Sequence, residues 1–141
     1  MYFVEHQGAN LLNEAINLRV IDKSGADASQ LLHLREASKH QQLIIVKTEK
    51  DEPLASIAFA KISKFTLRYI SKNSEHKLLS YEYNEGKILF VLDGFFRSHY
   101  FKESFKLLLP KIKKYRLIAY VKRGKLRVFY NDSGAIRPVK L

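Results

Sequence analysis

Asp93 is the residue whose position most strongly suggests chemistry. It follows the most apolar run of the chain, Lys87-Ile-Leu-Phe-Val-Leu92, and precedes Gly94. Sheets of α/β proteins commonly place functional groups at the ends of central strands, where partial desolvation raises the pKa of a carboxyl group. The structural alternative is that Asp93 caps the turn into the next helix. Both interpretations put Asp93 just beyond the end of a strand.

Histidines could supply a base or a metal ligand. The five are His6, His33, His40, His76 and His99, and their spacings match none of HxxxH, HxH and HExxH. Because the chain also has no cysteine, we expect no metal site. We also expect no tightly bound cofactor. His99, close after Asp93 in the sequence, is the first candidate for a nearby base and His33 the second. Both could equally be ordinary helix residues.

Positive charge is concentrated in the second half of the chain. Residues 1–60 carry 6 Lys/Arg and 8 Asp/Glu, a net charge of −2, whereas residues 61–141 carry 19 and 6, a net charge of +13, consistent with the +11 of the whole chain. The candidate binding residues are Lys111, Lys113, Lys114, Arg116, Lys122, Arg123, Lys125 and Arg127. Such a charge predicts acidic partners: nucleic acid, anionic lipid or an acidic protein.

Tyrosines are interleaved with these cations at Tyr115, Tyr120 and Tyr130. Aromatic rings among cations are typical of surfaces that stack on bases and neutralise phosphates. Strand alternation also places polar residues toward solvent, so an ordinary solvated face explains the pattern equally well.

Length and composition indicate one globular domain over residues 1–141. No apolar run approaches the roughly 18 residues of a membrane span, and the N-terminus lacks the basic and apolar regions of a secretory signal. We therefore expect a cytoplasmic protein. The sequence contains no Walker A, GxGxxG or GxSxG motif, and no Arg/Gln-x-x-Gly-x-Gly/Ala loop of the kind that binds pyrophosphate in acetyl-coenzyme A transferases.

The elements that must position these residues follow from hydrophobic spacing. Helices are expected over 10–18, from 27 or 29 to 39, and over 98–111, with a break at Ser24-Gly25-Ala26. Strands are expected over 43–46, 54–62, 87–92, 116–122 and 126–130, with 65–70 an ambiguous third strand and Arg123-Gly124 a tight turn. The pattern predicts an α/β domain with a mixed, mostly antiparallel sheet and flanking helices.

Three ordered pieces of this pattern resemble the toxin-activating lysine acyltransferases of the hemolysin-activating type. Pro53-Leu-Ala-Ser-Ile-Ala-Phe-Ala60 is similar to the family's Pro-Val-Ala-x-x-x-Trp-Ala strand, and Gly86-Lys-Ile-Leu-Phe-Val-Leu-Asp93 to its Gly-x-x-x-Trp-Phe-Ile-Asp. The third piece is a helix, then the strands 116–121 and 126–130, and Gly134. The resemblance covers about 42–134.

The resemblance implies a fold like the acetyltransferase superfamily, a catalytic aspartate at Asp93, and an acyl donor carried on acyl carrier protein. That protein is small and acidic, so the basic second half suits it. The family's catalytic histidine would fall in Asn17-Leu-Arg19, which holds none. The base could therefore come from His33 or His99, the chemistry could differ, or activity could be lost.

The resemblance predicts an enzyme that modifies a bacterial toxin or bacteriocin precursor by acyl transfer. In a short branch of the family, a homologue works with a partner protein to attach a siderophore to the C-terminus of a microcin. The alternatives are a nucleic-acid-binding module and a non-catalytic subunit that docks an acidic partner. We expect a homo- or hetero-oligomer.

Overall fold

The protein is described by a computed structural model that covers residues 2–5, 8–22, 25, 27–132 and 135–139. His6, Ser24, Ala26 and Gly134 lie outside these residues. The chain forms two compact units, each built from two segments: unit 1 is Met1–Ala58 with Asp93–Pro110, and unit 2 is Phe59–Leu92 with Lys111–Leu141. One domain over 1–141 stays a prediction.

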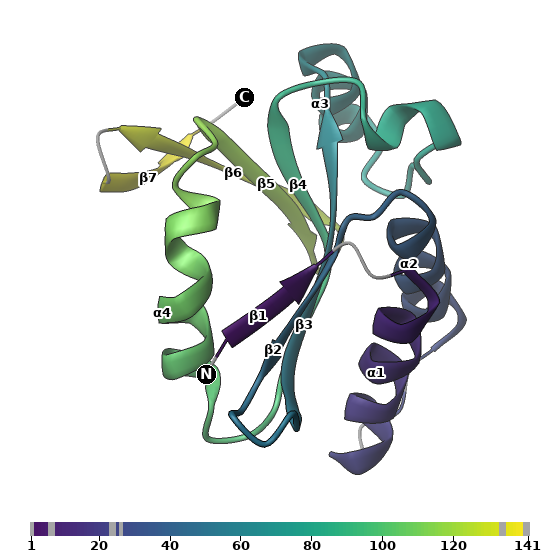
Figure 1. Ribbon diagram of the computed structural model, residues 1–141. Helices are drawn as coiled ribbons and strands as arrows, with labels where there is room; N and C mark the ends of the chain where they lie inside the picture. Colours follow the sequence, from purple (N-terminus) through teal and green to yellow (C-terminus); the bar gives the residue numbers. More distant parts are fainter. Residues whose placement is uncertain (1, 6–7, 23–24, 26, 133–134, 140–141) are drawn as a thin grey trace. The chain divides into compact units, whose positions relative to one another are not determined.

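Unit 1 contains β1 (Tyr2–Glu5), α1 (Gly8–Ile21), α2 (Ala28–Lys39), β2 (Leu43–Lys47), the first part of β3 (Pro53–Ile62), the end of β4 (Ile88–Phe96) and most of α4 (Phe101–Ile112). β2 pairs antiparallel with β1 and with β3, which confirms the predicted hairpin. Figure 1 shows α1 and α2 side by side on one face of these strands and α4 on the other.

The predicted start of α2 is confirmed by its cap. The Asp27 carboxylate accepts a hydrogen bond from the Gln30 backbone N–H at 2.8 Å, and the Gln30 side chain accepts one from the Asp27 N–H at 2.9 Å. This reciprocal pairing satisfies two donors that a helix start otherwise leaves free. Leu34 and Ala37 then face the core, where both are fully buried.

Unit 2 contains the rest of β3 and β4, α3 (Lys64–Lys72), the short 3-10 helix η1 (Ser80–Tyr83), β5 (Leu117–Lys122), β6 (Lys125–Asp132) and β7 (Ala135–Val139). β4 and β5 are parallel, whereas β6 pairs antiparallel with β5 and β7. The β5–β6 turn has Arg123 and Gly124 at φ 52° and 75°, the left-handed conformation that tight hairpin turns require. The core joins Leu67 and Ile70 of α3 to Ala119 and Val128.

The strands follow the order β1-β2-β3-β4-β5-β6-β7. Four neighbouring pairs are antiparallel and the β4–β5 pair is parallel. The predicted class, a mixed and mostly antiparallel α/β sheet with flanking helices, is therefore confirmed. None of the helices in the described ranges is long and apolar enough to cross a bilayer.

Three local predictions are corrected. Residues 65–70 form helix α3, because Ser63 caps its start by accepting the Thr66 N–H at 3.1 Å. β4 continues to Phe96, so Asp93 lies inside the strand and caps no turn. α4 begins at Phe101, so His99 precedes the helix, with a φ of 72°. Strands β1 and β7 were not predicted.

Candidate active site

Asp93 forms a buried ion pair with Arg19 within unit 1. The Asp93 carboxylate accepts a hydrogen bond from Nη2 of Arg19, and the two side chains are only 8% and 4% exposed. One lies on β4 and the other near the end of α1, separated by 74 positions in the sequence. A buried pair of this kind demands good geometry, because both charges lose their hydration.

The fold carries Arg19 inward on the apolar side of α1. Leu11, Ala15 and Leu18 are buried along this helix, and Arg19 follows Ala15 by four residues, one helical turn. Phe95 lies two residues beyond Asp93 on β4, and alternate residues of a strand share a face. The guanidinium carbon of Arg19 lies 4.6 Å from the centroid of the Phe95 ring, within cation–π range.

One hydrogen-bond donor of the Arg19 side chain is not used by the ion pair with Asp93. Its Nε is buried and finds no hydrogen-bond partner among the residues that the structure describes. Buried polar groups are nearly always paired, so an orphaned donor calls for an explanation. Together, Asp93 and Arg19 offer a carboxylate acceptor and an unused N–H donor within one buried pair.

Among the described residues, neither predicted histidine forms a hydrogen bond with Asp93. His99 is exposed and His33 is half-buried on α2. Within the described part of the chain, the hydrogen-bond partner of Asp93 is Arg19 and neither histidine. A guanidinium stays protonated and cannot accept a proton, so this pair differs chemically from a histidine–aspartate pair.

Sequence reasoning missed Arg19. The resemblance aligns Asn17-Leu-Arg19 with the segment that holds the family's histidine. The absence of a histidine there does not predict a role for Arg19. An arginine on the same helical side as Leu11, Ala15 and Leu18 was the signal that could have found it, because arginine is rarely buried without a partner.

The candidate binding residues all belong to unit 2. Lys111 lies in the last turn of α4, and its Nζ lies 5.9 Å from the centroid of the Phe59 ring. Burial of Lys111, and then the charge of Lys114, lower its pKa from the ordinary 10.5. Lys113, Lys114 and Arg116 follow as exposed residues before β5.

The remaining candidate cations belong to the β5–β6 hairpin. Lys122 pairs with Lys125 across the strands, and Tyr120 with Arg127, so these four share one face. The Tyr120 and Phe129 rings stack on this face, with centroids 5.8 Å apart. Arg123 lies exposed in the turn.

Comparison with known proteins identifies the fold. No model of a known protein family matches the chain, and no curated protein matches it. The solved structure of the GNAT-like decarboxylase GphF in complex with isobutyryl-CoA matches with a TM-score of 0.58 and 15% sequence identity, covering 87% of this chain and 66% of that one. This chain therefore has a GNAT-like fold, which confirms the acetyltransferase-like fold that the resemblance implied.

Proposed function

We propose that this protein transfers an acyl group to a bacterial toxin or bacteriocin precursor peptide. The observation that carries the proposal is the buried Arg19–Asp93 pair. It joins the aspartate that the sequence resemblance marks as catalytic to the segment where that family has its histidine. The GNAT-like fold agrees with acyl chemistry, and the GphF structure that shares this fold is a complex with an acyl-CoA.

The proposed reaction joins a peptide amine to the carbonyl carbon of an acyl thioester. The new C–N bond forms and the C–S bond breaks. The proton that the amine loses passes by way of Asp93 to the departing thiolate, which leaves as the thiol. The Asp93 carboxylate accepts the amine proton, a role that typically contributes about 10²–10⁴-fold in rate. Arg19 donates its free Nε–H to the carbonyl oxygen as negative charge develops there.

Acyl carrier protein is the proposed donor. Unit 2 carries 16 Lys/Arg and 4 Asp/Glu, a net charge of +12, whereas unit 1 carries 9 and 10, a net charge of −1. A small acidic carrier would be steered toward unit 2, and the sequence has no pyrophosphate-binding loop of the acetyl-coenzyme A type. A separate alternative is that the protein helps a partner subunit attach a siderophore to the C-terminus of a microcin, a reaction in which the peptide supplies a carboxyl group and not an amine.

Co-expression with a candidate precursor peptide tests the function. We expect the wild-type chain to increase the intact mass of the peptide by one acyl group or one siderophore. Asp93→Asn should abolish the increase, whereas the control Glu103→Gln, at an exposed acid of α4, should leave it intact. Modification at the wild-type rate by the Asp93→Asn variant would show that Asp93 has no role in transfer.

The aromatic and basic face of the β5–β6 hairpin supports a second candidate, binding of single-stranded nucleic acid. Tyr120 and Phe129 present rings beside Lys122, Lys125 and Arg127, and stacking on such rings tolerates any base. This function predicts binding that weakens steeply between about 50 and 200 mM salt. Absence of binding at low salt would exclude it.

A further inference from the structure

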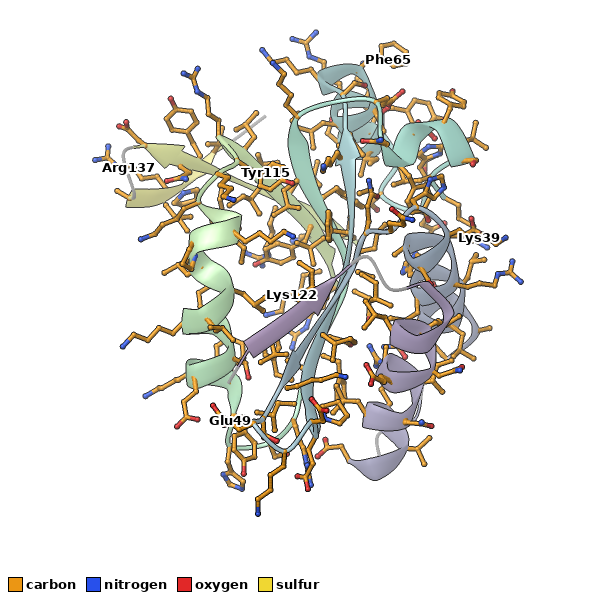
Figure 2. The ribbon with its side chains drawn as sticks, viewed as in Figure 1. Lys39, Glu49, Phe65, Tyr115, Lys122 and Arg137 are labelled. Carbon is orange, nitrogen blue, oxygen red and sulfur yellow. The ribbon has the colours of Figure 1, made fainter. Side chains whose placement is uncertain are left out.

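α3 presents two stripes to solvent that its packing does not require. Lys64, Arg68 and Lys72 recur every four residues, and Phe65 and Tyr69 run beside them, while Thr66, Leu67 and Ile70 form the buried side. Phe65 is 80% exposed and Tyr69 48% exposed. Figure 2 shows the Phe65 ring extending away from the ribbon. A helix stabilised only by its buried side has no need of exposed aromatics.

The segment at η1 extends this apolar surface. Leu79, which caps η1, is 54% exposed and Tyr81 within it is 68% exposed. We define the α3–η1 patch as these two residues with Phe65, Tyr69 and the three cations of α3.

A buried carboxylate fixes the two parts of the patch together. Glu82 accepts hydrogen bonds from the Leu79 backbone N–H at 2.7 Å and from the Thr66 hydroxyl at 3.2 Å, and it pairs with His76 Nε2 at 2.9 Å. The His76 ring in turn packs edge-on against Tyr69, with centroids 4.7 Å apart. η1 is thus held to α3, and its exposed side chains keep a fixed place beside the helix.

We propose that the α3–η1 patch docks on an anionic lipid surface. Tyrosine rings favour the boundary between headgroups and acyl chains, because they combine an apolar body with a polar hydroxyl. Helices that lie in this boundary carry aromatics on one side and lysine or arginine beside them. The three cations of α3 would meet the lipid phosphates, and the net charge of +12 on unit 2 favours an anionic surface. The proposal is independent of the acyl-transfer function.

The expected effects follow from the two stripes. Each lysine or arginine near an anionic bilayer strengthens binding by about fivefold, so the triple variant Lys64→Gln/Arg68→Gln/Lys72→Gln should bind about 100-fold more weakly. Phe65→Ser with Tyr81→Ser removes apolar insertion and should cost at least about tenfold. All five positions are exposed, so folding should survive, which circular dichroism would check.

Vesicle co-sedimentation with the full chain tests the proposal. The probes are vesicles of phosphatidylglycerol and phosphatidylcholine in a 3:7 mixture and vesicles of phosphatidylcholine alone. The matched control Lys50→Gln/Lys102→Gln/Lys106→Gln removes the same charge from exposed positions of unit 1. We expect binding to the anionic vesicles, weak binding to the neutral ones, and at most about a threefold loss in the control.

Four results would overturn the proposal. Three of them are no binding to anionic vesicles at low salt, an equal loss in the control and patch triple variants, and full binding by the Phe65→Ser/Tyr81→Ser variant. The fourth result would show that the patch binds a protein partner instead. In that case the Phe65→Ser/Tyr81→Ser variant would bind purified acyl carrier protein more weakly, while its binding to vesicles stayed unchanged. None of these readouts requires acyl transfer, so failure here is distinct from failure of the proposed enzyme activity.

Discussion

The Arg19–Asp93 pair allows a quantitative test that needs no substrate. Both side chains are almost fully buried, so removing one partner leaves a charge in an apolar setting, which typically costs about 3–5 kcal/mol. Replacing both by apolar residues of similar volume is often neutral or stabilising. Arg19→Met and Asp93→Leu should therefore each destabilise strongly, whereas the double variant should unfold near the wild-type midpoint.

Urea denaturation of the four proteins measures this coupling as a double-mutant cycle. We expect the sum of the losses in unfolding free energy of the two single variants to exceed the loss in the double variant by about 3 kcal/mol or more. This is the typical cost of breaking a buried ion pair. Single losses below about 1 kcal/mol, typical of solvent-exposed pairs, would refute the reasoning. So would strictly additive losses, because the residues would then not interact. Urea denaturation of Asp93→Asn, carried out in parallel, shows whether that variant is folded.

Further predictions concern the site and unit 2. Arg19→His removes the guanidinium N–H that is proposed to stabilise the developing negative charge and should lower the transfer rate, measured by intact mass; an unchanged rate would argue against that role of Arg19. Burial opposes ionisation of Glu82, but hydrogen bonds from Leu79 and Thr66 and the contact with His76 outweigh it and hold the pKa of Glu82 below 4.5. Its stabilisation is therefore complete above about pH 4.5 and is lost as pH falls through the lowered pKa; thermal denaturation of Glu82→Gln should show a flatter acid limb, and an unaltered limb would contradict this. Gly86→Ala would place a Cβ 2.1 Å from the Ile62 carbonyl oxygen and should destabilise by more than about 2 kcal/mol in urea; normal stability would mean that the backbone yields there.

The elements that sequence predicted well are those whose signals are local. Asp27 and Gln30 predict the start of α2, and Arg123-Gly124 predicts the β5–β6 turn. A helix cap and a tight turn both depend only on residues that are close in the sequence. The hairpin of β2 and β3 likewise follows from two apolar runs with a charged turn between them.

Predictions failed where tertiary contacts decide. Residues 65–70 are rich in aromatic and β-branched types, yet the Ser63 cap and the burial of Thr66, Leu67 and Ile70 make them a helix. Short apolar runs do not distinguish strand from helix by periodicity alone.

The site shows the same limit. Asp93 was found from its place after an apolar run, but its partner lies 74 positions away and is an arginine where a histidine was sought. No local pattern could join the two. Only the fold brings the last turns of α1 to β4.

The central proposal is that the protein transfers an acyl group from a carrier-bound thioester to a peptide, with Asp93 as the proton acceptor. The most direct measurement is the rate at which the purified chain converts a precursor peptide, followed by intact mass, with acyl carrier protein thioester as donor and acyl-coenzyme A as the parallel donor. We predict conversion with the carrier-bound donor and a loss of about 10²–10⁴-fold in folded Asp93→Asn protein. Equal rates for the wild-type and Asp93→Asn proteins would contradict the account.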